Sequence, residues 1–324
     1  MDALSGILAG PRAQGAFLLR TVMAPPWSIR IEDGAPLTAV AVIAGTAWLV
    51  GPREAPMRLD EGDVALVRGP DPYVVADSPD TAPQILIHPG QRCTTLDGHD
   101  LHEDLALGVR SWGNDPAGAT VLLTGTYETT TAVGQRLLDA LPPLVRVGRH
   151  DGQRTLLDLL ADEVVQDRPG QEVVLDRLLD LVVLDVVRTW LDRPDVEVPP
   201  WYRGHGHPVV GRALQLIHRR PDHPWTLVEL AAESGASRAT LARRFRELVG
   251  EAPMAYLTSW RLTLAADLLG EPGATIAGVA AKVGYGSAFS FSTAYKRHHG
   301  MSPHQHRRAT GVGAGRMRVA PRAP

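Results

Sequence analysis

The sequence predicts an α+β protein in two parts: an N-terminal β-barrel with a helical hairpin, then an all-α domain with two helix-turn-helix motifs. Three observations predict this fold class. Between residues 17 and 124, short apolar runs are broken by Gly, Pro and Asp, as in all-β domains. From residue 149 onward, apolar residues recur at helical spacing instead. The C-terminal part also contains two segments that share one arrangement of capping residues and glycines.

The charge is unevenly distributed along the 324 residues, although the net charge is only −3. From Trp201 to the C-terminus there are 17 Lys and Arg against 7 Asp and Glu, a net charge of +10. The other residues hold 16 basic and 29 acidic side chains, a net charge of −13. A basic C-terminal part joined to an acidic N-terminal part indicates a module that binds a polyanion.

Several compartments are disfavoured by the sequence. No apolar run approaches the roughly 18 residues of a membrane span. The N-terminus "MDALSGILAGPRAQG" has an acid where a signal peptide needs basic residues. The single cysteine, Cys93, excludes an internal disulfide and a cysteine-rich zinc cluster. We therefore expect a cytoplasmic protein that has no membrane partner.

The N-terminal part contains runs that predict strands joined by tight turns: "WSIRI", "LTAVAVIAGTAWLV", "DVALVRG", "YVVAD", "QILIH" and "TVLLTGTY". They predict a barrel or a sandwich. Strands and helices do not alternate regularly here, and there is no glycine-rich phosphate loop. Both observations argue against a nucleotide-binding fold.

Two helices are predicted within residues 149–194, from "QRTLLDLLADEVVQD" and "QEVVLDRLLDLVVLDVVRTWLDR", with "RPG" as the stop and restart signal between them. The second helix is apolar on more than one stripe, so it must cover the barrel and also meet a second surface. That surface is either a partner subunit, which would make the chain a homodimer, or the interior of the same chain.

The first helix-turn-helix motif follows "DRPDVEVPPWYRGHGHP", which predicts a linker, and the amphipathic helix "HPVVGRALQLIHRR". Thr226 and Glu229 fit a capping box, Gly235 ends that short helix, and Ser237 caps the next one. On this second helix the residues expected to face inward are Leu241, Phe245 and Leu248, and those expected to face outward are Arg238, Ala239, Ala242, Arg243 and Arg246.

The second motif repeats the first after the longer helix "PMAYLTSWRLTLAADLLG". Thr275 caps its short helix, Gly284 and Gly286 form the turn, and Ser287 caps its second helix. The two motifs share an Ala-Ala pair, the turn glycine, the capping serine, an inward aromatic residue and a closing glycine. One such match is weak, but an internal duplication is a strong signal for DNA recognition.

The duplicated region resembles the C-terminal DNA-binding domain of the AraC/XylS transcriptional regulators. The resemblance covers roughly Val209 to Arg308 and rests on "ELAAESGASRATLARRFRELVGEAPMAYLTSWRL" and "IAGVAAKVGYGSAFSFSTAYKRHHGMSPHQHR". It implies two helix-turn-helix units on one connecting helix, with double-stranded DNA as the partner.

The resemblance also assigns DNA contacts. Arg243 stands where the family places a base-contacting side chain, and arginine to guanine is the commonest specific contact. In the second unit Thr293 replaces the usual arginine. We therefore expect the first unit to dominate sequence readout and the second to add phosphate, methyl or shape contacts. The residues expected to contact DNA are Ser237, Arg238, Ala239, Thr240, Ala242, Arg243, Arg246, Ser287, Phe289, Ser290, Thr293, Lys296 and Arg297.

The second motif has two other interpretations. The aromatic rings could stack on bases, but Phe291 and Tyr295 lie four residues apart and are expected in the core, which leaves Phe289 as the exposed ring. The histidines could bind a metal ion. Because His298 and His299 are adjacent and point apart on a helix, we expect no metal site.

The N-terminal part resembles the cupin-type effector domain of the same family, over roughly Leu4 to Val147. A metal-dependent cupin enzyme is the alternative, but the strand "LTAVAVIAG" lacks the histidines that such a site needs, and Tyr73 stands at the later ligand position. We expect no metal, no other cofactor and no catalytic residue. The domain is instead expected to bind a small organic effector in an apolar pocket.

The residues expected at that effector site are Trp27, Trp48, Tyr73, His88 and Cys93. For each aromatic residue an ordinary place in the core is the competing interpretation. Because Cys93 follows Arg92 and lies near His88 in sequence, a lowered thiol pKa would make it a redox sensor. A small buried cysteine is the alternative.

The sequence thus predicts a ligand-responsive transcription regulator. The expected domains are a β-rich effector domain at 1–148, the hairpin at 149–194, a linker at 195–207, the DNA-binding domain at 208–310 and a disordered basic tail at 311–324. RNA polymerase is an expected partner if the protein is an activator. We expect an effector to bias the hairpin and thereby the DNA-binding units.

Overall fold

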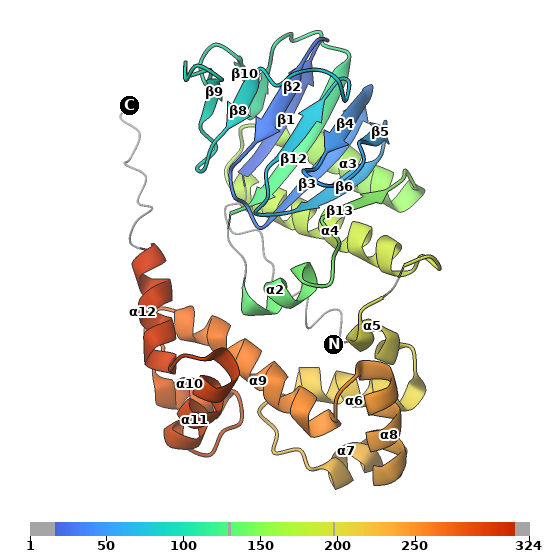
Figure 1. Ribbon diagram of the computed structural model, residues 1–324, viewed down its shortest axis with the longest axis vertical. Coiled ribbons are helices and arrows are strands. Elements are labelled where there is room, and N and C mark those ends of the chain that lie inside the picture. The colour runs from blue at the N-terminus through green and yellow to red at the C-terminus, as the bar shows by residue number, and fades with distance from the viewer. Residues whose placement is uncertain (1–16, 129–130, 197, 315–324) are drawn as a thin grey trace. The chain divides into compact units, whose positions relative to one another are not determined.

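The computed structural model describes residues 17–128, 131–196 and 198–314 of the chain (Figure 1). The start of the predicted effector domain and the end of the predicted tail lie outside these residues. The chain divides into two compact units. We call residues 17–128 and 137–196 the sheet unit, and Thr131–Arg136 together with the residues from Val198 onward the helical unit.

The sheet unit contains two sheets, which confirms the sheet-rich N-terminal part. The seven-stranded sheet has the order β10-β11-β1-β12-β3-β6-β13. Its strands are Ala106–Gly108, Ser111–Gly113, Phe17–Met23, Thr120–Tyr127, Leu37–Ala44, Val64–Arg68 and Leu144–Val147. The six-stranded sheet has the order β5-β4-β7-β2-β8-β9. Its strands are Met57–Asp60, Thr46–Val50, Tyr73–Ala76, Ser28–Ile31, Ile85–Ile87 and Cys93–Thr95.

The core of this unit lies between the two sheets. Met23, Val40 and Leu122 come from the seven-stranded sheet and meet Leu49 and Leu59 of the six-stranded sheet in one buried cluster. Alternation along the strands produces it, because every second side chain of a strand points to the same face. In β4, for example, Ala47 and Leu49 are buried while the residues between and beside them are only half-buried.

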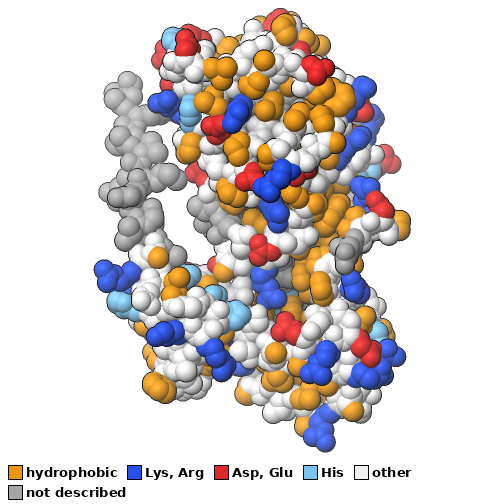
Figure 2. Space-filling model, viewed as in Figure 1, with side chains coloured by type: hydrophobic (Ala, Val, Ile, Leu, Met, Phe, Trp, Pro, Cys, Tyr) orange, Lys and Arg blue, Asp and Glu red, His pale blue; other side chains and the backbone are white. Residues whose placement is uncertain are grey.

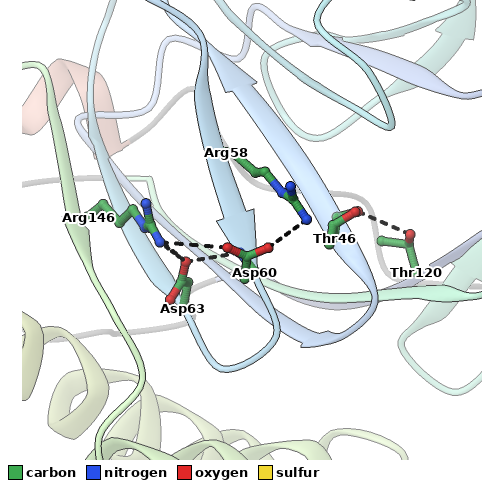
Figure 3. Close-up of polar contacts among 6 residues, drawn as sticks. All are labelled: Thr46, Arg58, Asp60, Asp63, Thr120 and Arg146. Carbon is green, nitrogen blue, oxygen red and sulfur yellow. Dashed lines mark hydrogen bonds and ion pairs between the residues drawn. The ribbon is translucent and has the colours of Figure 1, made fainter.

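A polar network ties the two sheets together at one edge (Figure 3). Asp63, just before β6, is almost fully buried and accepts hydrogen bonds from the backbone N–H of Asp60 and from Nε of Arg146, at 2.9 and 2.8 Å. Arg58 pairs with Asp60 at 3.0 Å. Nearby, the Thr120 hydroxyl donates to the carbonyl of Thr46. The network joins β5 of one sheet to β6 and β13 of the other.

The predicted hairpin is present as α3 (Asp151–Val164) and α4 (Gln171–Leu191), which contact the seven-stranded sheet (Figure 1). Gly125 of β12 allows α4 to come close, because a Cβ atom there would lie 2.4 Å from Cδ1 of Leu179. The opposite side of the hairpin remains apolar and exposed. Leu159, Val174 and Leu181 are each about half exposed, at 51%, 45% and 46%.

The helical unit confirms an α-helical C-terminal part and the α+β class. Its helices after residue 198 are α5 (Pro200–His205), α6 (Pro208–Arg219), α7 (Leu227–Glu233), α8 (Arg238–Val249), α9 (Pro253–Gly270), α10 (Ile276–Lys282), α11 (Ala288–His299) and α12 (Pro303–Ala314). One further helix, α2 (Ala132–Leu138), begins in this unit and ends in the sheet unit.

Two segments differ from the prediction. Helix α5 lies inside the segment 195–207, which was predicted as a linker, and it packs against α6 and α8. It forms because Trp201 is buried and because Gly204 lets the helix approach Val249 and Val210. At the other end, α12 continues to Ala314, four residues into the predicted tail. Within the described ranges, every helix is too short or too polar to cross a membrane.

Candidate nucleic-acid interface

Helices α7 and α8 form what we call the first helical pair. Thr226 caps α7 by accepting from the N–H of Glu229 at 3.2 Å, and Ser237 caps α8 by accepting from the N–H of Thr240 at 3.2 Å. Gly235, between the helices, has a φ of +71°, a left-handed conformation that glycine adopts without strain. The capping box is incomplete, because the Glu229 carboxylate pairs with His223 at 2.7 Å.

Helices α10 and α11 form the second helical pair and repeat these features. Thr275 and Ser287 cap them by accepting from the N–H groups three residues later, at 3.0 and 3.1 Å. Gly284 corresponds to Gly235 and has a φ of +79°. A Cβ atom at Gly284 would also lie 2.5 Å from the carbonyl of Asp222, so the turn requires glycine.

One face of α8 is buried and the opposite face is exposed and basic. Leu241 and Phe245 are fully buried, as predicted, but Leu248 is only half-buried and Val249 takes the inward position. The reason is the four-residue spacing from 241 through 245 to 249. Arg243 is exposed and pairs with Glu247 at 2.9 Å. The other residues predicted to contact DNA from α8 and its cap are exposed, except the half-buried Ala242.

Exposed charge continues beyond α8. Figure 2 shows Lys and Arg side chains spread over the visible face of the helical unit.

Within α8, the Glu247 carboxylate also accepts from Arg244 at 3.1 Å, so it is shared between two arginines. Both guanidinium groups hold the pKa of Glu247 below its usual range, chiefly through the hydrogen bond from Arg243. Because exposed pairs of this kind are weak, Arg243 can exchange Glu247 for another acceptor at small cost.

The exposed face of α11 is chemically different. Phe289, in the first turn, is 84% exposed, and no other large hydrophobic residue in the described part of the chain is as exposed. The Ser290 hydroxyl donates to the Ser287 carbonyl, and the Thr293 hydroxyl donates to the Phe289 carbonyl. Their donors are therefore used within the helix. Lys296 and Arg297 are exposed in the last turn.

The inward aromatic residues lie where the sequence predicted them. Phe291 and Tyr295 are fully buried. The histidines that follow support this core: the His299 ring lies 4.3 Å from that of Tyr295, and its Nε2 is 3.2 Å from the carbonyl of Leu262. Burial lowers the pKa of His298 and of His306. Within the described ranges, no three His, Cys, Asp or Glu side chains gather as metal ligands would.

The five residues predicted at an effector site do not share one location. Trp27, Tyr73 and Cys93 lie in the core cluster between the sheets and are at most 7% exposed. Trp48 alternates with the buried Ala47 and Leu49, so it points to the other face of β4. His88 is half-buried, and its Nε2 lies 2.9 Å from the Thr94 hydroxyl.

Cys93 lacks the surroundings of a reactive thiol. It is 6% exposed, and burial, followed by the charge of Asp100, raises the pKa of its thiol to about 12. The neighbouring Arg92 and His88 were expected to lower this pKa, but in the structure the effect of burial is larger. The geometry therefore disfavours the redox-sensor alternative.

The sequence did not predict the contact between residues 131–136 and α9. The Asp267 carboxylate of α9 accepts from the backbone N–H groups of Ala132 and Val133, and the Arg136 guanidinium lies over the Tyr256 ring. The signal available in the sequence was Asp267 itself, a single acid within an otherwise apolar stretch of helix. Such a residue suggests a specific polar partner, but its spacing does not identify the partner.

Known proteins and protein families are similar in sequence to both parts of the chain. A family model described as Cupin matches residues 2–192, and one described as a helix-turn-helix domain matches residues 230–309. A putative AraC-like transcription regulator of Streptomyces lividans is 32% identical over 313 residues, which are 95% of this chain and 98% of that protein. The HTH-type transcriptional regulator AlkR of Acinetobacter baylyi is 28% identical over 95% of this chain and 99% of its own length.

Among solved structures, the DNA-binding domain of AdpA, a global transcriptional factor, in complex with a target DNA is similar to part of the chain. It is 28% identical, with a TM-score of 0.32, and the match covers 34% of this chain and 97% of that one.

Proposed function

Because this chain belongs to the AraC-like transcription regulators, with a cupin domain followed by a helix-turn-helix domain, we propose that its two helical pairs are two DNA-recognition units. Helices α8 and α11 would each enter the major groove. The observation that carries this proposal is the pair of matched units, each with a capped helix, a left-handed glycine and a second capped helix, at the two ends of α9.

The length of α9 suits this arrangement. It has 18 residues and is about 27 Å long at 1.5 Å per residue. Successive major-groove segments on one face of a duplex lie about 34 Å apart. Exposed cations at both ends, from Arg238 to Arg246 in one unit and at Lys296 and Arg297 in the other, would contact phosphates on either side.

We assign effector binding and regulation to the sheet unit, which includes the hairpin. The exposed apolar side chains Leu159, Val174 and Leu181 would be covered by a second copy of the chain, and sedimentation of the full-length protein at several concentrations tests this. The relatives are regulators, and we propose no catalytic activity for the chain.

The experiment that tests the proposal is selection of duplex fragments from a random library by the full-length protein, followed by salt titration of the selected and scrambled fragments. A regulator prefers the selected fragment at every salt concentration. Binding that is weak, equal for both fragments and abolished by salt would show only a basic surface, and would contradict the proposal.

Arg243→Ala is expected to remove about 1–3 kcal/mol of the preference for the selected fragment, because a bidentate contact to guanine is lost. The matched control is Arg244→Ala, which removes the same charge and also breaks an ion pair with Glu247, at 3.1 Å. The control is expected to weaken binding to selected and scrambled fragments alike. Equal losses for both fragments with Arg243→Ala would contradict a base contact.

Phe289 is expected to read thymine through its C5-methyl group, since apolar side chains on a recognition helix contact that methyl. Replacing all thymine in the selected fragment by uracil removes only methyl groups. Burying one such group contributes about 0.8 kcal/mol, so wild-type protein should bind the uracil fragment about fourfold more weakly. Phe289→Ala should bind both fragments equally, and Arg243→Ala should keep the difference. If wild type does not distinguish the fragments, this assignment is wrong.

A further inference from the structure

Residues 131–136 belong to the helical unit, although in the chain they stand between β12 and β13 of the sheet unit. Two backbone N–H groups at the start of α2, those of Ala132 and Val133, donate to Oδ1 and Oδ2 of Asp267 at 2.5 and 3.2 Å. The Thr131 hydroxyl accepts from the N–H of Gly134 at 2.9 Å. Thus a carboxylate of α9 satisfies helix-terminal donors that α2 cannot satisfy itself.

The other end of this segment contacts the other half of α9. The Arg136 guanidinium carbon lies 5.4 Å from the Tyr256 ring centroid and 5.7 Å from that of Trp260, which are cation–π distances. Both rings are 1% exposed. Tyr256, Trp260 and Asp267 are four and seven residues apart, so they follow one face of α9 over about 16 Å.

The two ends of the segment also reach different DNA-recognition units, one through Tyr256 of α9 and the other through the packing of Ala132. Tyr256 packs edge-on against Phe245 of the first helical pair, with ring centroids 5.7 Å apart. Ala132, at the opposite end, packs against the core that contains Phe291 and Tyr295 of the second helical pair. The segment therefore spans the two halves of the helical unit.

We propose that residues 131–136 act as a splint across α9, fixing the placement of one DNA-recognition unit relative to the other, with Asp267 and Arg136 as the positioning residues. The proposal rests on the DNA-binding function proposed above. The splint is also close along the chain to the sheet unit, to which we assign regulation. The splint begins four residues after Tyr127, the last residue of β12, whose hydroxyl donates to Asp180 of the hairpin at 3.1 Å.

The electrostatics of Asp267 agree with this role. Burial raises the pKa of its carboxyl, while the N–H groups of Ala132 and Val133, followed by the charge of His306, act in the opposite direction. If the splint leaves, the carboxylate loses the N–H donors of Ala132 and Val133. Departure of the segment is therefore costly, and the segment holds one position unless a competing force acts on it.

The first test needs no DNA. Spin labels on Glu233→Cys and Ala281→Cys, both exposed and in different helical pairs, report the distance between the pairs in the full-length chain with Cys93→Ala. Asp267→Ala and Arg136→Ala are each expected to broaden the distance distribution, and Asp267→Asn, which keeps one acceptor oxygen, to broaden it less. The charge-matched control is Glu271→Ala, an exposed acid just beyond α9, which should leave it unchanged. An unchanged, narrow distribution in both splint variants would overturn the proposal.

The second test uses the selected DNA fragment and versions with one base pair inserted between the two recognised segments. Wild type should lose affinity on insertion by about 5- to 150-fold, as expected for coupled sites. The splint variants should bind the original fragment more weakly and lose much of this dependence on spacing. If the variants keep the wild-type dependence on spacing, the role proposed for the splint is wrong, while the proposal of DNA recognition is unaffected. If wild type prefers no fragment, the proposed DNA-binding function is wrong. The distance measurement still decides whether the splint fixes the placement of the two helical pairs.

Discussion

Phe245→Ala is expected to lower the free energy of unfolding of the helical unit by about 3–5 kcal/mol, the usual cost of truncating a buried aromatic residue. Phe245 is fully buried and makes an edge-on contact with Tyr256, so the substitution opens a cavity between α8 and α9. Hydrogen exchange of the full-length chain in increasing denaturant measures the effect separately in peptides from each unit. Peptides from α8 and α9 should lose protection, and peptides from β3 and β12 should keep it.

The internal repeat supplies the matched control for this prediction. Tyr295 holds the position in α11 that Phe245 holds in α8, and it is fully buried. Within the described part of the chain its hydroxyl has no hydrogen-bond partner, and burial raises its pKa. Tyr295→Phe should therefore be neutral or stabilising, by up to about 1–2 kcal/mol, because an unpaired buried hydroxyl is removed. A clear loss of protection in α11 would show that the hydroxyl is paired and that the repeat is not equivalent here.

The parts of the fold that the sequence predicted well are those determined by neighbouring residues. Thr226, Ser237, Thr275 and Ser287 cap helices because a side-chain oxygen reaches an N–H group three residues later, which is local chemistry. The left-handed glycines are local in the same sense. Strand alternation was equally visible, but Trp48 was expected at the effector site and instead alternates with the buried Ala47 and Leu49.

The features that escaped prediction depend on contacts between distant residues. Nothing near Ala132 in sequence indicates that its N–H meets Asp267, 135 residues later. Helix α5 was hidden for a related reason, since its sequence is rich in Pro and Gly and it is stabilised by burial of Trp201. Burial also determines the thiol pKa of Cys93. Its basic sequence neighbours suggested a reactive thiolate, but neighbours in sequence do not determine the dielectric environment of a side chain.

Cys93 should be almost inert toward alkylation in the native protein. The thiolate is the nucleophile, and with a thiol pKa of about 12 only about one molecule in ten thousand carries it at pH 8. A thiol with the ordinary pKa of about 8.5 is about one-quarter ionised there. The ratio of these two thiolate fractions predicts that iodoacetamide reacts roughly 2,500-fold more slowly with native than with denatured protein at pH 8, as followed by mass spectrometry of the full chain.

The pH dependence of the same reaction separates low ionisation from simple lack of access. If ionisation limits the rate, native alkylation should rise about tenfold per pH unit from 8 to 11 without a plateau, because the thiolate fraction rises in that way below the pKa. Ionisation also opposes folding: the native state holds this proton more tightly than the unfolded state, so stability should fall as pH rises from about 8.5 toward 12. The control is Cys93→Ala, which should show no alkylation at any pH. A plateau near pH 7–8 in the native protein would instead mean that Arg92 or His88 stabilises the thiolate, and would restore redox sensing as a function of the sheet unit.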